Sequence, residues 1–500
     1  MNGSRSVHAI VYAGKNLLSQ TLSSIIQFRP GKYFASGYWP SAPRFGWSSS
    51  YRSCAAFAYR PYLAAPVLAL AGIFALAGCG KEGSDQVKIP QATEMENGAE
   101  STEVSVQSMF PDQSWALPME NMGPLQGSPG ITAKDCSTCH ASHYEEWSRS
   151  THAHALSDLQ FQSELSKPTS PEWLCLNCHI PVGNQRETIV RKVKDGDLLQ
   201  PVHEKNPRFD PSMMEEGVTC ATCHLRNVDG RTVVLGPLGT GRAPHPVVAD
   251  RKSLQKRCLD CHNVTYKVSS SLVCFFDTGN ELAKSELSDR SCSSCHMPEL
   301  ERKIASVAGD FPERRSHLHY FIGGGIPKEF SLLPYQEKGG YRSGLDLSLV
   351  GYEWIPASGT LRFTIRMANK DTAHHLPTGD PERFILVKVI AYPTSEKAEK
   401  SYRIGQHWEW EPEARQIADN RLRSGEIRIW QDEMHLDEPP QRLRLEAVHV
   451  RLTEKNAEYM ENTAARTNEK YRSRISRLRQ HYPRQRIIHS EDILLGSPLD

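Results

Sequence analysis

Five Cys-x-x-Cys-His pentapeptides are the sequence feature that most strongly indicates the fold and cofactors of this 500-residue chain. They are Cys136-Ser-Thr-Cys139-His140, Cys175-Leu-Asn-Cys178-His179, Cys220-Ala-Thr-Cys223-His224, Cys258-Leu-Asp-Cys261-His262 and Cys292-Ser-Ser-Cys295-His296. Two thiols three residues apart can form thioether bonds to the two vinyl groups of one haem, and the adjacent histidine then lies under the iron as proximal ligand. Zinc knuckles would need paired Cys-x-x-Cys units without an obligatory histidine, and every copy here has one. The pattern predicts five covalently bound haem c groups.

The segment before the first motif has the layout of an exported lipoprotein. Residues 63–78 form an apolar run, Arg52 and Arg60 precede it, and Leu-Ala-Gly-Cys79 closes it. Basic residues followed by an apolar run are typical of a secretory signal, and the last four residues resemble a bacterial lipobox, in which Cys79 is lipidated. An uncleaved membrane span would need ~20 apolar residues, more than this run has. We expect a lipid-anchored protein of the bacterial cell envelope, at the periplasmic or outer-membrane surface.

Composition divides the chain into five stretches. Residues 1–78 combine a start-site extension with the signal peptide, and residues 79–130 are polar and turn-rich, as in a flexible tether. Residues 131–335, here called the motif region, carry all five pentapeptides. Residues 340–455, the strand region, are rich in alternating apolar residues, and residues 456–500 predict a solvated C-terminal helix and tail.

These stretches predict a two-part architecture. The motif region has about 32 residues per haem, too few to enclose each haem in its own core, so we expect a mostly α and irregular multihaem domain with a haem-filled core. The strand region is expected to form an antiparallel β-sandwich-like domain. The net charge of only +1 gives no reason to expect a nucleic-acid partner.

Several phrases next to the motifs carry a family resemblance. They are Tyr144, Trp147 and His152-Ala after the first motif, Cys178-His-Ile-Pro181, Glu216-Gly-Val-Thr-Cys220, Cys295-His-Met-Pro298 and His375-Leu-Pro-Thr-Gly379. Together they resemble multihaem cytochromes c of the cytochrome c-554 type, over roughly residues 131–392. The resemblance implies an electron carrier outside the cytoplasm, with haem irons ligated mainly by two histidines.

Distal ligands are expected among the histidines outside the motifs, because imidazole is a natural sixth ligand for a low-spin haem. The candidates are His152, His154, His245, His317, His319 and His375. His317 or His319 lies before the glycine run Gly323–Gly325, which allows close approach of a haem edge. His375 lies in a Pro-Thr-Gly turn between strands, where a hairpin tip would reach a haem; a capping loop with surface histidines is the alternative.

Two functions stay open, and we favour the first. The chain is expected to pass electrons between a redox protein donor and a redox protein acceptor, with the lipid anchor as its contact to the membrane. The alternative is an oxidoreductase that acts on nitrite, hydroxylamine or a sulfur oxyanion at one haem with an open face. A structural subunit of a larger conduit would look identical in sequence.

Overall fold

The computed structural model describes residues 101–239, 241–307 and 311–495. The predicted signal peptide, the lipidation site Cys79 and the first part of the predicted tether lie outside these residues. None of the described helices is long and apolar enough to cross a membrane.

Residues 101–130 are part of the fold. Strand β1 (Glu103–Ser105) pairs antiparallel with β2 (Thr188–Lys194), and α1 (Val106–Met109) follows directly. Phe110 and Trp115 are buried, with ring centroids 5.0 Å apart, and both pack against Tyr266. The tether predicted for residues 79–130 therefore does not extend over residues 101–130. Burial of a few large aromatic side chains outweighs the polar composition around them.

The motif region is a series of short helices joined by loops. Trp147, in the helix that follows the first motif, is buried and donates from Nε1 to the Val218 carbonyl over 2.8 Å. The helices are α2 (Ala133–Ser137), α3 (Ala141–Ser148), α4 (Leu159–Leu165), α5 (Glu172–His179), α6 (Pro211–Met214), α7 (Cys220–His224), α8 (Arg251–Lys256), α9 (Leu259–His262), α10 (Thr278–Ala283), α11 (Cys292–His296) and α12 (Leu333–Lys338), with 3₁₀ turns η1 (Gly183–Gln185) and η2 (Phe330–Leu332).

Small sheets also lie between these helices, in a region predicted to be mostly α-helical and irregular. Their order is β1-β2-β3, β4-β5-β6, β7-β8 and β9-β10. The strands not yet given are β3 (Pro201–Lys205), β4 (Leu225–Val228), β5 (Arg231–Gly236), β6 (Val247–Ala249), β7 (Val264–Ser269), β8 (Leu272–Phe276), β9 (Glu299–Arg302) and β10 (Arg314–His317). The β4-β5 hairpin turns at Asp229-Gly230, whose φ values of 49° and 74° fit a tight two-residue turn.

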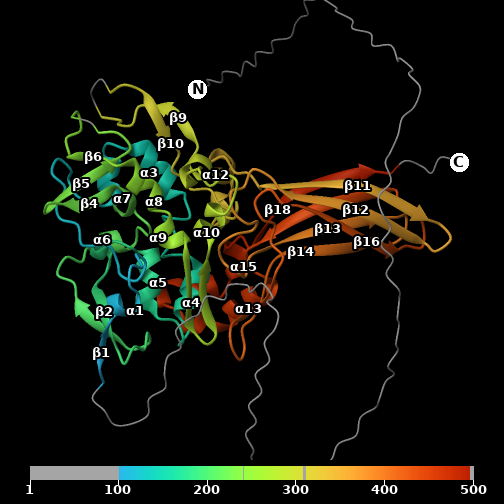
Figure 1. Ribbon diagram of the computed structural model, residues 1–500, viewed down its shortest axis with the longest axis horizontal. Helices are drawn as coiled ribbons and strands as arrows, with labels where there is room; N and C mark the ends of the chain where they lie inside the picture. Colours follow the sequence, from blue (N-terminus) through green and yellow to red (C-terminus); the bar gives the residue numbers. More distant parts are fainter. Residues whose placement is uncertain (1–100, 240, 308–310, 496–500) are drawn as a thin grey trace, which may run out of the picture. The chain divides into compact units, whose positions relative to one another are not determined.

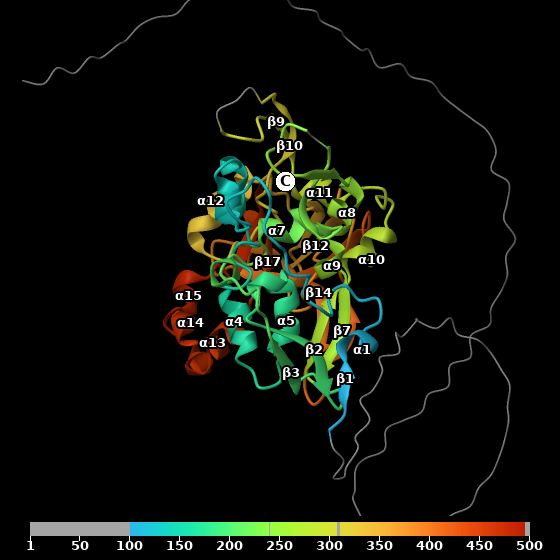
Figure 2. The same ribbon diagram turned by 90° about the vertical axis from the view of Figure 1, so that its left-hand side faces the viewer.

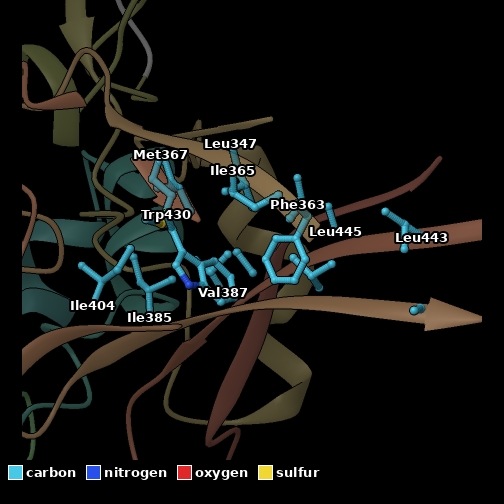
Figure 3. Close-up of a cluster of buried hydrophobic side chains, with 14 of the residues drawn as sticks. Leu347, Phe363, Ile365, Met367, Ile385, Val387, Ile404, Trp430, Leu443 and Leu445 are labelled. Atoms are coloured by element: carbon cyan, nitrogen blue, oxygen red, sulfur yellow. The ribbon is translucent and has the colours of Figure 1, made fainter. Parts of the chain in front are cut away.

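The strand region contains the two large antiparallel sheets, whose long strands lie side by side in Figure 1. One has the order β11-β12-β16 and the other β15-β14-β13-β17-β18. Alternate residues of β12, such as Phe363 and Ile365, share one apolar cluster with Ile385 of β13 and Leu445 of β17 (Figure 3). The strands are β11 (Leu345–Ile355), β12 (Thr360–Asn369), β13 (Phe384–Tyr392), β14 (Ala398–Glu409), β15 (Arg415–Asp419), β16 (Ile427–His435), β17 (Arg442–Val450) and β18 (Gln485–Leu494). Helices followed by antiparallel sheets agree with the predicted order of the fold.

The C-terminal stretch differs from the single solvated helix predicted for residues 456–500. It forms α13 (Glu454–Thr463), the 3₁₀ turn η3 (Ala464–Arg466), α14 (Glu469–Ile475) and α15 (Leu478–His481), and β18 then pairs antiparallel with β17. The helices lie beside α4 in Figure 2, and Ile475 and Leu478 are buried in one cluster with Leu159. The long helix is interrupted because Asn468 caps a new helix by accepting from the Lys470 amide.

Replacing Trp115 by Ala should destabilise the fold, because truncating a buried aromatic residue costs about 3–5 kcal/mol. The midpoint of urea unfolding, followed by circular dichroism, should fall. Tyr352→Ala is the matched control, since Tyr352 is 43% exposed and its truncation should have little effect. An unchanged midpoint for Trp115→Ala would instead support the predicted flexible tether up to residue 130.

Candidate haem-binding sites

Each pentapeptide lies on or at the end of a short helix. Helices α5, α7, α9 and α11 end at the motif histidine, and α2 contains the first cysteine of the first motif. Residues three and four positions apart share one face of a helix, so the two thiols and the imidazole of a motif can face the same haem. All ten motif cysteines are free of disulfide bonds, and their thiols remain available for thioether bonds.

Hydrogen bonds to backbone carbonyls orient four of the five motif histidines. In each case the histidine Nδ1 lies 2.5–2.9 Å from a carbonyl oxygen. The pairs are His140 with Ile304 (2.7 Å), His179 with Ala155 (2.8 Å), His224 with Leu235 (2.9 Å) and His296 with Ile322 (2.5 Å). An Nδ1–H that donates to a carbonyl fixes the tautomer in which Nε2 carries the free lone pair. Each of these imidazoles is therefore prepared to bind a metal through Nε2.

Four motif histidines have a second imidazole at a nearly constant separation. Their ring centroids lie 6.2–6.4 Å from those of four histidines outside the motifs, in the pairs His140–His245, His224–His319, His262–His152 and His296–His374. With metal–nitrogen bonds of about 2 Å and ring centres roughly 1 Å behind the nitrogens, two axial imidazoles on one metal have centroids about 6 Å apart. The separations therefore fit one iron between the rings of each pair.

Burial favours the neutral form of the two imidazoles in the His262–His152 pair. It lowers the pKa of His152 to about 3 and the pKa of His262 to about 4. A neutral imidazole is the form that binds a metal ion. The His262–His152 pair thus has both the separation and the protonation state that axial ligands need.

His179 differs from the other motif histidines, because no described histidine lies across from it at this separation. Its ring instead stacks on Phe161, with centroids 3.5 Å apart and planes only 5° apart. A ring on the face of the imidazole supports its orientation without lying in front of Nε2. The second motif therefore has a well-oriented proximal ligand and no paired imidazole.

The predicted distal histidines divide into two groups. His152, His245 and His319 each lie opposite a motif histidine, as given above. His154 and His317 do not: His154 lies on a surface pocket with Tyr471, and His317 donates from Nδ1 to the Met297 carbonyl over 2.7 Å, with Nε2 3.7 Å from Glu299.

The loop after β12 brings His374 and not His375 to the fifth motif. The buried carboxylate of Glu281 accepts from the His375 amide over 3.1 Å and from the Thr378 hydroxyl over 2.6 Å, and its Oε1 lies 3.5 Å from His375 Nδ1. Arg421 holds Glu281 in place over 2.6 Å. Because successive side chains of an extended segment point to opposite sides, His374 faces His296. Strands β12 and β13 lie in different sheets, so the predicted hairpin does not form, and the loop between them places His374 rather than His375 opposite His296.

Cysteines of different motifs contact each other. The thiols of three cysteine pairs lie close enough to shift each other's pKa: Cys136 and Cys220, Cys178 and Cys261, and Cys258 and Cys292. A thioether-bound haem lies next to its cysteines, so groups attached at the first and third, second and fourth, and fourth and fifth motifs must be neighbours.

A buried polar cluster that the sequence analysis missed lies beside His179. Lys328 Nζ contacts Asp158 Oδ2, and the Tyr482 hydroxyl donates to Asp158 Oδ1 over 2.6 Å. The guanidinium of Arg451 lies 4.0 Å from the centre of the Tyr482 ring. The charges of Asp158 and Lys328 both act on the pKa of His179. The alternation of Val448, His449, Val450 and Arg451 at the end of a strand was the available sequence signal for the β17 part of this cluster.

Comparison with known proteins agrees with this site. Residues 135–225 match the model of the family described as cytochrome c554 and c-prime. A penta-haem cytochrome c552 from Thermochromatium tepidum is similar in structure, with a TM-score of 0.48 and 18% sequence identity over 73% of this chain and 99% of that chain. No curated protein matches the chain. The family match agrees with the predicted resemblance to multihaem c-type cytochromes over residues 135–225, which contain the first three of the five motifs.

Asp158 should make stability depend on acid pH. Burial alone would raise its pKa, but the charges of Lys328 and Arg451 prevail and lower it from 3.8 to about 2. As the pH falls from about 4 to about 2, the unfolded chain takes up this proton first, so roughly 2 kcal/mol of stability is lost. Unfolding midpoints of the wild type and of Asp158→Asn should converge over this range.

The control for this measurement is Asp112→Asn, at an exposed turn. It should keep the wild-type pH profile. A constant difference between wild type and Asp158→Asn from pH 4 to pH 2 would contradict the assigned ion pair.

Proposed function

We propose that the chain is a pentahaem electron carrier in which four of the five haem irons are ligated by two histidines. A redox role for covalently bound haem follows from the family match, and the four imidazole pairs at 6.2–6.4 Å are the observation that carries the finer assignment. When bound, the haem iron supplies the electron transfer by changing between its ferric and ferrous states.

The protein's role in this function is to hold the axial histidines in position and to set the distances between the haems. Two imidazoles on one iron accommodate both oxidation states in one geometry, which limits reorganisation when an electron arrives or leaves. The histidine-to-carbonyl hydrogen bonds hold the rings against rotation. The thiol contacts support a relay in which the fourth motif adjoins the second and the fifth, while the first adjoins the third.

The surroundings of this relay are also part of the proposal. The haems would fill the core of the motif region, which has few residues per motif, and the two large sheets would form a β-sandwich that presents His374. The apolar run ending at Cys79 supports a lipid anchor in the cell envelope, with redox proteins as donor and acceptor.

One observation favours an enzymatic alternative. Among the described residues, His179 has no imidazole across from it, and an iron with one open face can bind a substrate such as nitrite, hydroxylamine or a sulfur oxyanion. This alternative needs only the second haem, and the other four would still carry electrons to it.

Intact mass of the denatured holoprotein should show five haems per chain, because thioether bonds survive unfolding. Electron paramagnetic resonance of the resting protein should show low-spin ferric signals together with one high-spin signal from the iron at His179. Four or fewer haems would contradict the pentahaem assignment. Steady-state turnover of nitrite or hydroxylamine would support the oxidoreductase alternative over the electron-carrier proposal.

His374→Ala should convert the haem of the fifth motif from six to five ligands. A further high-spin signal should appear, and the midpoint potential of that haem should rise, because loss of a nitrogen donor disfavours the ferric state. His375→Ala is the matched control, since His375 faces Glu281, and its spectrum should stay that of the wild type. The reverse result would return the ligand role to His375.

A further inference from the structure

Two buried glutamate–arginine ion pairs have the same arrangement next to two of the distal histidines. In the first, Arg302 donates to both carboxylate oxygens of Glu146, and these side chains are 13% and 10% exposed. In the second, Arg421 donates to Glu281 over 2.6 Å, and these side chains are 4% and 2% exposed. Charge-assisted hydrogen bonds are strong and fix the orientation of both partners. The two carboxylates are therefore held in defined positions.

Each carboxylate also accepts a hydrogen bond from the backbone of a segment that carries a distal histidine. Glu146 Oε2 accepts from the amide of His319 itself over 2.9 Å. Glu281 Oε2 accepts from the amide of His375, the residue after His374, over 3.1 Å. Because an amide moves with its own Cα and the adjacent peptide planes, a fixed acceptor limits the positions that the neighbouring imidazole can reach.

The distal imidazoles are oriented relative to this backbone by carbonyl groups. His319 Nδ1 lies 2.9 Å from the His317 carbonyl oxygen, which also accepts from Arg302 Nη2 over 2.7 Å. His374 Nδ1 lies 2.9 Å from the His375 carbonyl oxygen. An Nδ1–H that donates to a carbonyl leaves Nε2 free for a metal. The orientation of both Nε2 atoms thus depends on contacts that end at a buried carboxylate.

The two carboxylates lie on helices that are tied to other motifs. Glu146 lies on α3, which begins directly after His140 of the first motif. Glu281 lies on α10, where the Asn280 amide donates over 3.0 Å to Oδ1 of Asn263, the residue directly after the fourth motif. The distal histidines face the third and fifth motifs. Each carboxylate therefore joins a helix next to one motif to the distal histidine of another.

We propose that these two buried glutamates are positioning residues for distal ligands, each with its arginine as counterion. Glu146 holds His319 on the iron of the third haem. Glu281 holds His374 on the iron of the fifth haem. The inference rests on the histidine ligation in the proposed function and adds the groups that stabilise it. Loss of such outer contacts typically lowers metal affinity or activity about 10–100-fold.

The test uses the full-length holoprotein, with the haem count of every variant verified by intact mass. Carbon monoxide bound per chain by the reduced protein counts the irons with a free axial position. His319→Ala and His374→Ala are the references, and each should bind one more carbon monoxide than the wild type. Glu146→Ala and Glu281→Ala should each show the same gain, together with one additional high-spin ferric signal in electron paramagnetic resonance.

A double variant separates positioning from a purely structural role. Replacing both members of a buried ion pair by apolar residues of similar size is often neutral or stabilising, whereas removal of one partner leaves an uncompensated charge. Glu146→Leu combined with Arg302→Met should therefore keep the urea midpoint of the wild type. It should still bind one more carbon monoxide, because the His319 amide has lost its acceptor.

Glu461→Ala is the matched control. Glu461 also accepts from a backbone amide and a guanidinium, both of Arg479, over 3.0 and 2.9 Å. This pair lies among the C-terminal helices, which carry none of the four paired histidines. The control should bind as much carbon monoxide as the wild type.

The references separate the two ways in which the test can fail. If His319→Ala and His374→Ala gain a carbon monoxide site while Glu146→Ala, Glu281→Ala and the double variant match the control, the positioning role is overturned. If the histidine references themselves gain no site, the failure lies in the ligand assignment of the proposed function, and the inference falls with it.

Discussion

The hydrogen bond from a histidine Nδ1 to a backbone carbonyl is the interaction on which the haem-binding architecture depends. It removes the choice of tautomer, stops rotation of the ring and leaves Nε2 as the metal-binding atom. The carbonyls come from segments outside the motif itself, such as the loop at Ile304 for His140 and strand β5 at Leu235 for His224. The loops and small sheets of the motif region therefore act as ligand holders.

The proximal half of each site could be predicted from sequence because it is local. Cysteines and histidine within five residues define their own geometry, whereas the distal half depends on tertiary contacts. His152, His245 and His319 were among the expected ligands and do face motif histidines. The choice between His374 and His375 depended on Glu281, almost a hundred residues away in sequence, and no local pattern contains that information.

For the fold, too, the features set by local sequence could be predicted, and those set by tertiary contacts could not. Alternating strands such as β12 and β13 were visible in sequence because one face is buried and the other is not. The segment of residues 101–130 was misassigned since its two buried aromatic residues stand among polar ones. The hairpin at Asp229-Gly230 had a usable turn signal, but its strands are too short to show alternation. The final strand, β18, belongs to a sheet begun a hundred residues earlier.

The segment from Ile322 to Ile326 joins the two halves of the molecule through its carbonyl groups. Ile322 is bound by His296, Gly324 by His449, Gly325 by Arg486 and Ile326 by Arg451. Three of these four donors come from residues 449–486, close to the end of the chain. The segment that orients His296 of the fifth motif is therefore held by residues that lie more than a hundred positions later in the sequence. During biogenesis, haem attachment and closure of the large sheet become one coupled assembly problem, in which a C-terminal truncation would be felt at a cofactor more than a hundred residues upstream.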